Sequence, residues 1–418
     1  MAAVIYNATI IILDSPSLEV EHIALDFFPS RADLLPSKKV CIIVPVRNEA
    51  DLLRQTLDAL RNQTDPTGLP LSPKTYEVIV LVNNSTDNSF QIVSDYALEF
   101  PEFLLSVANI YLPDYHAHIG TVRRLLMDEA YNRLTRTGSQ QGIIASTDGD
   151  TMVDRNWVYH IIAEIKNGND AVGGRILTAK NAGAARLFHL RDVTYRCLLA
   201  QAESLLDPLA HNPFPCHFQY FGANMAVTCK MYEKAGKLPV VPYLEDAAFH
   251  RALLNEDAKI RYSFNAKVYT STRTDGRVQI GFSEQLRKWQ LEEQTSQTQF
   301  VEDVSTSLKL FSIKNQLRRC WSAYRECNTL MQKELDEVAF DMKVNAEWLK
   351  AQMIQMSSFG SLWSQAKQAA PCDGITPNAF QPVSQAITQL RKFIQVDYPV
   401  TSQMSPAGKS AGADYAEA

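Results

Sequence analysis

The chain has 418 residues, of which 46% are hydrophobic and 21% charged, which is the composition of a globular protein larger than one ordinary domain. Its formal net charge of −5 offers no basic surface, so nucleic acid is not expected as a partner. No stretch approaches the roughly 20 uninterrupted apolar residues of a membrane-spanning helix, so no transmembrane anchor is expected.

The cysteines indicate a reducing compartment. The chain has seven of them, scattered and without a C-x-x-C pair. An odd number without paired spacing is typical of free thiols and gives no zinc-binding pattern. We therefore expect a cytoplasmic protein without a zinc site, with peripheral attachment to a membrane as the alternative.

The first half of the chain alternates predicted strands and helices. After a lead-in segment, residues 1–38, the apolar runs 40–44 and 78–82 predict two strands buried on both faces. An order of strand, helix and strand predicts parallel strands in a doubly wound α/β sheet. The helix between the two strands is indicated by leucines at helical spacing, Leu53, Leu57 and Leu60.

A pair of aspartates ends the next buried strand. The apolar run 143–145 leads into Ser146 and Thr147, followed by Asp148-Gly149-Asp150. Side chains two residues apart on an extended segment point the same way, toward the edge where open α/β sheets bind ligands. Two carboxylates facing one point need a proton or a cation, and Mg²⁺ or Mn²⁺ fits because these ions prefer oxygen ligands and also bind diphosphates. An ordinary solvated turn is the alternative.

Two pairs of arginines suggest an anionic ligand. Arg123 and Arg124 lie in the first turn of a predicted helix, where the helix dipole makes cations unfavourable. An anionic ligand would remove this conflict, and two solvated arginines are the alternative. Arg273 and Arg277 lie in a later loop and fit either closure over a diphosphate or a solvated basic loop.

The second half of the chain contributes further strands and then becomes helical. Residues 221–227 predict a strand with a small-residue start, and Glu245 and Asp246 open a helix of about ten residues. Two short strands are expected at 260–264 and 267–271. Beyond them the periodicity is mostly helical, and the last predicted helix covers residues 383–396.

Five short motifs occur in an order that resembles the family 2 glycosyltransferases, which are nucleotide-sugar-dependent transferases of the GT-A fold. Each motif is weak alone, and their order and spacing over residues 39–290 carry the resemblance. The motifs are Pro45-Val46-Arg47-Asn48-Glu49, Ser85-Thr86-Asp87, Asp148-Gly149-Asp150, Gly222-Ala223-Asn224-Met225-Ala226 and Glu245-Asp246.

The resemblance implies a fold and a division of the chain. The fold is an α/β, GT-A-type, doubly wound and mostly parallel sheet with a C-terminal helical region. The expected parts are a lead-in segment 1–38, a GT-A glycosyltransferase domain 39–282, a C-terminal helical region 283–400 and a disordered tail 401–418.

The resemblance also implies roles for single residues. Asp148 and Asp150 would hold Mn²⁺ or Mg²⁺. Asp246, with Glu245 beside it, would be the base that takes the proton of the acceptor hydroxyl. The acceptor would lie beside Gly222, Ala223, Asn224 and Trp289. The residues expected to bind the nucleotide-diphosphate sugar are Pro45, Arg47, Glu49, Asn83, Asp87, Arg123, Arg124, Asp148, Arg273 and Arg277.

Several alternatives stay open within the family. Asn83 and Asn84 stand where members usually carry an aspartate pair that reads uracil, so the donor is expected to be a UDP- or GDP-sugar. Some retaining relatives, the mannosylglycerate and glucosylphosphoglycerate synthases, use a histidine as third metal ligand. His250 is the nearest candidate, and an ordinary surface or packed histidine is the alternative. Trp289 ends a segment, Gln285–Trp289, similar to the Gln-x-x-Arg-Trp motif of polysaccharide synthases, and a packing role is its alternative.

Two alternatives lie outside the family. A nucleotidyltransferase uses a similar sheet and metal, but it needs a glycine-rich basic loop after the first strand, and Pro45–Glu49 has no glycine. A non-catalytic nucleotide-sugar-binding protein would be expected to lose the aspartate pair or the base. The acceptor is not specified by any motif, and a small molecule, a lipid-linked group and a polysaccharide all remain open.

Overall fold

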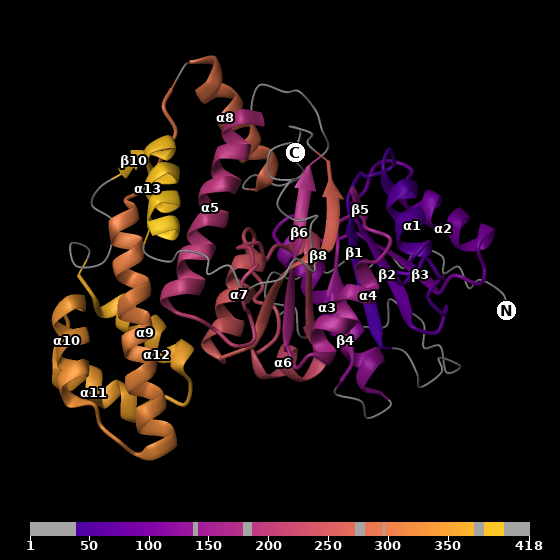
Figure 1. Ribbon diagram of the computed structural model, residues 1–418. Helices are drawn as coiled ribbons and strands as arrows, with labels where there is room; N and C mark the ends of the chain where they lie inside the picture. Colours follow the sequence, from indigo (N-terminus) through magenta and orange to yellow (C-terminus); the bar gives the residue numbers. More distant parts are fainter. Residues whose placement is uncertain are drawn as a thin grey trace.

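The computed structural model describes residues 39–136, 141–178, 186–271, 281–295, 297–371 and 380–396. Within these ranges the centre is an eight-stranded sheet in the order β3-β2-β1-β4-β7-β6-β8-β5 (Figure 1). Arg273, Arg277, the lead-in segment and the tail lie outside the described residues. The strands are β1 (Val40–Val46), β2 (Tyr76–Asn83), β3 (Leu105–Ile110), β4 (Ile143–Ser146), β5 (Thr151–Val153), β6 (Ala171–Thr178), β7 (Met225–Thr228) and β8 (Ile260–Thr270).

The pairing directions confirm the α/β fold class. Strands β1 to β4 run parallel to one another, as do β6 and β8. Strand β7 is antiparallel to β4 and β6, and β5 is antiparallel to β8. Three details differ from expectation. The strand predicted at 221–227 is shorter, because Gly222–Asn224 form a 3-10 turn and β7 begins at Met225. Residues 260–270 form one strand instead of two, because its register against β6 shifts at Gly174 and Arg175 and absorbs the irregularity. Residues 151–153 form a short strand that the sequence did not indicate.

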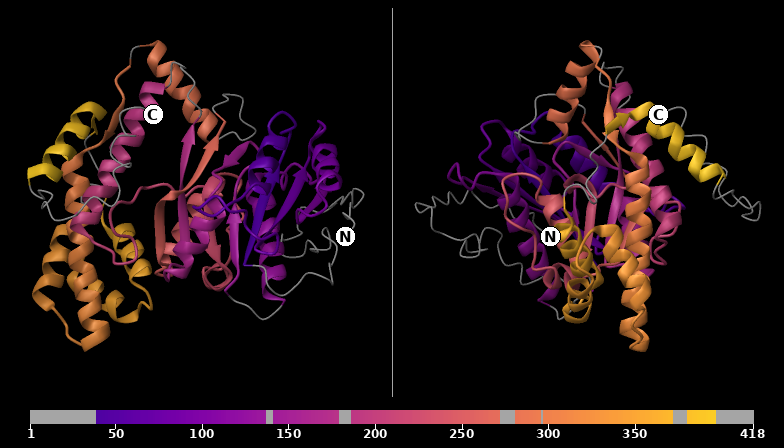
Figure 2. Two further views of the ribbon diagram at one scale, coloured as in Figure 1. Left: turned by 45° about the vertical axis from the view of Figure 1, so that its right-hand side comes forward. Right: turned by 90° about the vertical axis from the view of Figure 1, so that its left-hand side faces the viewer.

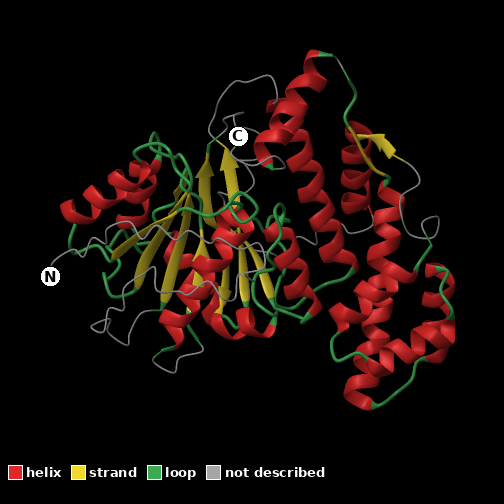
Figure 3. Cartoon of the chain, turned by 180° about the vertical axis from the view of Figure 1, so that it is seen from behind, coloured by secondary structure: helices red, strands yellow, loops and turns green. Residues whose placement is uncertain are grey.

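Helices cover both faces of the sheet, which explains why its strands are continuous apolar runs (Figures 1 and 3). Alternate residues of β1 enter the two cores: Ile43 belongs to the core that α3, α6 and α7 cover, and Ile42 to the core that α1, α2 and α4 cover. The helices are α1 (Leu53–Arg61), α2 (Ser89–Glu99), α3 (Ile119–Thr135), α4 (Trp157–Lys166), α6 (Cys229–Lys234) and α7 (Glu245–Asn255).

A helical region lies beside the sheet, at the end remote from β1–β3 (Figures 1 and 2). Helices α9 to α12 enclose their own core, while α5 packs against α13, α9 and α8 and joins the two parts. No helix in the described part of the chain is both long and apolar enough to cross a membrane. The elements are α5 (Arg186–Leu206), α8 (Phe282–Gln294), β9 (Phe300–Glu302), α9 (Val304–Cys327), α10 (Gln332–Met342), α11 (Ala346–Gln355), α12 (Phe359–Ala369), β10 (Phe380–Pro382) and α13 (Val383–Val396).

The helical region is also fastened to α7. The Asp257 carboxylate, just after α7, accepts the N–H groups of Phe359 and Gly360 at 2.7 Å each, at the start of α12. The Ser358 hydroxyl donates to the Asn255 carbonyl at 2.5 Å. A Cβ at Gly360 would lie 1.7 Å from the Leu254 carbonyl oxygen, so this contact requires glycine.

Candidate active site

Two strand ends meet where the sheet changes its winding direction. Strand β1 pairs with β2 on one side and with β4 on the other, with Ile43 opposite Ser146. Open α/β sheets bind ligands outside the carboxyl ends of their strands at such a point. Pro45 is buried near the end of β1, and Asp148 follows β4, so the topology brings the first and third expected motifs together.

The loops after β1 and β2 are fastened to each other. The Asp87 side chain is exposed. Partial desolvation would by itself raise the pKa of this carboxyl, but hydrogen bonds from Ser89 and Ala50 hold the pKa below its usual range. Asp87 therefore positions the loops, and its contact with a donor stays a prediction. The backbone N–H groups of Asn48, Glu49 and Ala50 donate, in that order, to Ser85 Oγ at 3.0 Å, Ser89 Oγ at 2.9 Å and Asp87 Oδ2 at 3.0 Å.

Three other expected donor residues lie at the same edge. Arg47 is exposed, and its Nη1 donates to the Ala117 carbonyl at 3.1 Å. Glu49 is buried and its side chain packs beside Gly149, while Asn83 is the buried last residue of β2. These positions place polar groups from two strand ends around one edge of the sheet.

The aspartate pair sits on a turn that is packed against the β1 loop. The Thr56 hydroxyl donates to the Gly149 carbonyl at 2.9 Å, and the Thr151 hydroxyl donates to Asp150 Oδ1 at 3.3 Å. A Cβ at Gly149 would lie 3.1 Å from Val46 and 3.2 Å from Glu49, so a side chain at this position would be crowded. The glycine thus lets the turn lie close to the end of β1.

One buried guanidinium connects the aspartate turn with the start of α7. Arg123 is 3% exposed and donates to two carboxylates, Asp148 and Glu245, at 3.0 Å each. It also donates to Ser146 Oγ at 2.6 Å and to the Gly222 carbonyl at 3.0 Å. We refer to Arg123, Ser146, Asp148, Gly222 and Glu245 as the Arg123 cluster. Sequence reasoning missed Ser146, whose only signal is a hydroxyl at the end of an otherwise apolar strand.

The partners of the two arginines of α3 differ from expectation. Arg124 Nε donates to Asp128 at 2.8 Å, and its Nη1 donates to the Leu238 carbonyl at 2.9 Å. Protein groups therefore satisfy the buried guanidiniums of both Arg123 and Arg124. This removes the physical reason for expecting an anionic ligand to resolve the conflict with the helix dipole. Direct contact of either arginine with a donor diphosphate stays a prediction.

The acidic pair at the start of α7 divides into a buried and an accessible carboxylate. Glu245 is 4% exposed; burial raises its pKa, the Arg123 guanidinium opposes this, and Asp246 reinforces it. The partly exposed Asp246 accepts the Gly222 N–H at 2.9 Å and the Ala247 N–H at 2.7 Å. The exposed Leu244 before them has the left-handed φ of 56°, which costs a non-glycine residue roughly 1–2 kcal/mol.

The oxygen atoms at this edge suit a divalent ion. The Asp148 side chain is 35% exposed, and Asp150 follows on the same turn. Among the described residues, no three or more His, Cys, Asp or Glu side chains are grouped to hold a metal. The residues therefore fit an ion that uses one or two carboxylates and completes its shell with phosphate and water, as Mg²⁺ commonly does.

Two of the expected acceptor-side residues have packing partners instead. Asn224 is buried, accepts the Trp157 indole N–H at 2.8 Å, and donates to the carbonyls of Arg175 and Ala266. Trp289 is buried on α8, and its ring stacks on His189 of α5 with centroids 5.5 Å apart. These contacts agree with the packing alternative for Trp289 and give Asn224 a structural role, while contact of either residue with an acceptor stays a prediction. Gly222 and Ala223 lie in the turn that leads into β7, beside Asp246.

His250 lies on the same face of α7 as Asp246, and its partners are other protein groups. Its Nε2 lies 2.6 Å from the Tyr262 hydroxyl, and its ring stacks on Tyr220 with centroids 4.9 Å apart. Burial lowers the pKa of His250 to about 4. These contacts supply no support for a third metal ligand at this position.

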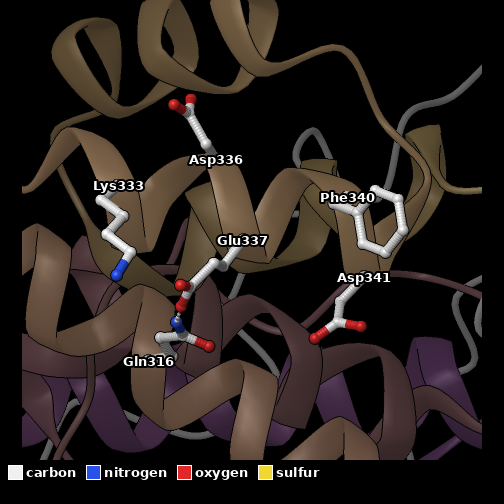
Figure 4. Close-up of a pocket in the computed structure, with 6 residues that line it drawn as sticks. All are labelled: Gln316, Lys333, Asp336, Glu337, Phe340 and Asp341. Carbon is white, nitrogen blue, oxygen red and sulfur yellow. Dashed lines mark hydrogen bonds between the residues drawn. The ribbon is translucent and has the colours of Figure 1, made fainter.

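A surface groove occurs far from these carboxylates. It has a volume of about 470 Å³ and lies between α9 and α10, where Gln316 donates to Glu337 at 3.0 Å (Figure 4). Its lining contains none of the residues expected in the active site. The candidate active site is therefore identified from the carboxylates at the strand ends and not from this groove. The lining residues are Gln316, Lys333, Asp336, Glu337, Phe340 and Asp341.

The fold and the carboxylates define a class of protein: an α/β protein with an oxygen-rich site at the carboxyl ends of its strands. Residues 41–221 match the model described as Glycosyl transferase family 2. Residues 41–221 thus carry a family 2 glycosyltransferase domain, which is the family that the ordered motifs resemble.

The chain is similar to further proteins over parts of its length. It is 27% identical to "Glycosyltransferase AglE" of Haloferax volcanii over 151 residues, 35% of this chain and 42% of the relative. The matched stretch thus spans less than half of that relative. Among solved structures, S. aureus TarS 1-349 with UDP-GlcNAc is 14% identical, covers 85% of this chain and 92% of its own, and has a TM-score of 0.42. Mannosyltransferase PcManGT of Pyrobaculum calidifontis, solved with GDP-Man and Mn²⁺, is 14% identical, covers 86% and 88%, and has a TM-score of 0.41.

Proposed function

We propose that the protein transfers a sugar from a nucleoside diphosphate sugar to an acceptor hydroxyl, with inversion at the anomeric carbon and Asp246 as the base. The observation that carries this proposal is the hydrogen-bonded connection between the two carboxylates that such a reaction needs. Asp148 is bound to Arg123, Arg123 to the Gly222 carbonyl, and the Gly222 N–H to Asp246.

Asp246 is suited to receive a proton. Its side chain is partly exposed, and the N–H groups of Gly222 and Ala247 fix the orientation of both oxygens. A carboxylate accepts about four hydrogen bonds, so capacity for an acceptor hydroxyl remains. In the transfer, the acceptor oxygen bonds to the anomeric carbon, the bond from that carbon to the diphosphate breaks, and the hydroxyl proton goes to Asp246. The nucleoside diphosphate leaves with the electron pair.

Asp148 and Asp150 are the residues that would hold Mn²⁺ or Mg²⁺. When bound, such an ion supplies positive charge that stabilises the diphosphate as a leaving group. The surrounding residues fix the turn: Thr56 holds the Gly149 carbonyl, and Arg123 holds Asp148. Glu245, which is buried, orients Arg123 rather than meeting substrate.

The donor would lie over the ends of β1, β2 and β4. The hydrogen-bonded loops that carry Glu49 and Asp87 surround this edge, and the buried amide of Asn83 ends β2. An amide both donates and accepts, so it suits uracil or guanine, and we propose a UDP- or GDP-sugar as donor.

The test compares Asp246→Asn with the unchanged protein and with Asp95→Asn, an exposed aspartate on α2 that serves as control. Donor binding is measured as the thermal shift produced by UDP- and GDP-sugars with Mn²⁺, and turnover as release of nucleoside diphosphate, with water as acceptor. Asp246→Asn should keep the thermal shift and lose about 10²–10⁴-fold in turnover, because its amide cannot take the proton.

Three outcomes contradict the proposal at different points. If no UDP- or GDP-sugar shifts the unfolding of the unchanged protein, the donor class is wrong. If Asp246→Asn turns over normally, the base assignment fails. If the sugar first released, observed before its anomers equilibrate, has the donor's anomeric configuration, the inverting mechanism fails.

A further inference from the structure

Arg123 is the point at which the proposed metal carboxylate and the helix of the proposed base meet. Its guanidinium donates to Asp148 on the aspartate turn and to Glu245 at the start of α7. The same group donates to the carbonyl of Gly222, whose N–H holds Asp246. One side chain therefore fixes three segments that are far apart in the sequence.

The geometry requires arginine at this position. A guanidinium has five N–H donors in a rigid plane, and four hydrogen bonds of Arg123 leave Nε, Nη1 and Nη2 toward four different acceptors. A lysine ammonium has three donors at one point and cannot reach all of these acceptors. The guanidinium also packs on the Gly222 backbone, where a Cβ would lie 2.4 Å from Nη2.

The charges give Arg123 a second effect. Its positive charge lies 3.0 Å from Asp148 Oδ1, so it competes electrostatically with a divalent ion for the same carboxylate. The cluster therefore holds Asp148 in place at the expense of some affinity for the ion.

We infer that Arg123 is a positioning residue that couples the ion site at Asp148 to the base on α7. This inference rests on the proposed function. The inference requires that removal of the guanidinium tighten Mn²⁺ binding and slow sugar transfer. Loss of a merely structural residue would weaken Mn²⁺ binding and slow transfer.

The test uses a background in which no buried carboxylate is left without its partner. Arg123→Met is made in the Glu245→Gln protein and compared with Glu245→Gln alone, so the pair differs only at Arg123. Arg123→Lys, which keeps the charge, is the second variant. Arg133→Lys is the matched control, because Arg133 is another buried arginine of α3 that pairs with Glu77 and Glu129, away from the cluster.

The probe for the first measurement is Mn²⁺ alone, titrated into the protein without donor. Arg123→Met in the Glu245→Gln background should bind Mn²⁺ roughly tenfold more tightly than Glu245→Gln alone, because a neighbouring positive charge is gone. Arg123→Lys should bind Mn²⁺ as the unchanged protein does and release nucleoside diphosphate about 10²-fold more slowly, because it holds Asp148 and Gly222 less closely. Arg133→Lys should change neither quantity.

Each result decides the inference. Equal or weaker Mn²⁺ binding after Arg123→Met overturns the competition at Asp148, and normal turnover of Arg123→Lys overturns the positioning role. If the unchanged protein binds Mn²⁺ but releases no nucleoside diphosphate from any donor, the proposed function fails, while the Mn²⁺ comparison still tests the competition at Asp148. If Arg123→Met does not fold, Arg123→Gln in the same background replaces it with the same expected Mn²⁺ result, and Arg123→Lys tests the positioning role.

Discussion

The substitution Gly222→Ala places a methyl group against the guanidinium of Arg123. An ideal Cβ at this position lies 2.4 Å from Nη2 and 2.5 Å from Cζ, whereas ordinary contact begins near 3.4 Å. The guanidinium or the Gly222 backbone must therefore move by about 1 Å. Arg123 cannot swing aside freely, because it is buried and hydrogen-bonded to four groups.

This displacement should reduce both stability and turnover. Overpacking of a buried site typically costs about 1–3 kcal/mol of unfolding free energy. A misplacement of about 1 Å at reacting groups can cost about 10²-fold in rate, and Gly222 itself holds Asp246. Unfolding in urea measures the first effect, and release of nucleoside diphosphate measures the second.

A matched glycine serves as the control. Among the described residues, no atom lies within 4 Å of an ideal Cβ at Gly281, so Gly281→Ala should leave turnover unchanged. If Gly222→Ala retains the turnover and stability of the unchanged protein, the close approach of Gly222 to Arg123 is not what holds the site, and the reasoning fails.

Three further outcomes are expected. Asp150→Asn should abolish the part of the donor-induced thermal shift that depends on Mn²⁺, and a Mn²⁺-dependent shift equal to that of the unchanged protein would contradict the metal assignment. Arg318→Met should lower the unfolding free energy by about 2 kcal/mol, less than the 3–5 typical of fully buried pairs, because Arg318 is partly exposed while its partner Asp207 is buried. An unchanged urea midpoint would refute this. Burial lowers the pKa of His217 to about 3, and its Nδ1 accepts the Gln219 N–H. As the pH falls, the unfolded chain therefore takes up a proton on this histidine at a higher pH than the folded chain does. Stability should therefore fall as the pH drops from about 6.5 toward 3, by up to about 1.4 kcal/mol per pH unit for this group, and His217→Gln should flatten this slope in urea unfolding measured across that range.

Local patterns in the sequence were sufficient for much of the fold. The apolar run 40–44 became part of the buried strand β1, and the last predicted helix, residues 383–396, has the same bounds as α13. Both features depend on the spacing of apolar residues within a few turns or along one strand. The family was likewise predictable, because its motifs are short and ordered along the chain.

The partners of Arg123 could not be predicted in this way. Glu245 lies 122 residues from Arg123 along the chain, and Asp148 lies 25 residues away on another element. Only the register of the sheet and the packing of α3 and α7 bring these groups together. The sequence revealed the conflict of a cation with the helix dipole, but it could not show whether a ligand or a protein carboxylate resolves it.

The contact between α12 and α7 has a consequence for the helix that carries the proposed base. Helix α7 has 11 residues, so about 16 Å separates Asp246 at its start from Asp257 beyond its end. Asp257 accepts two N–H groups from the first turn of α12, so the end of α7 that lies away from Asp246 is held by the helical region. The proposed base therefore lies on a helix whose far end is set by the position of α12.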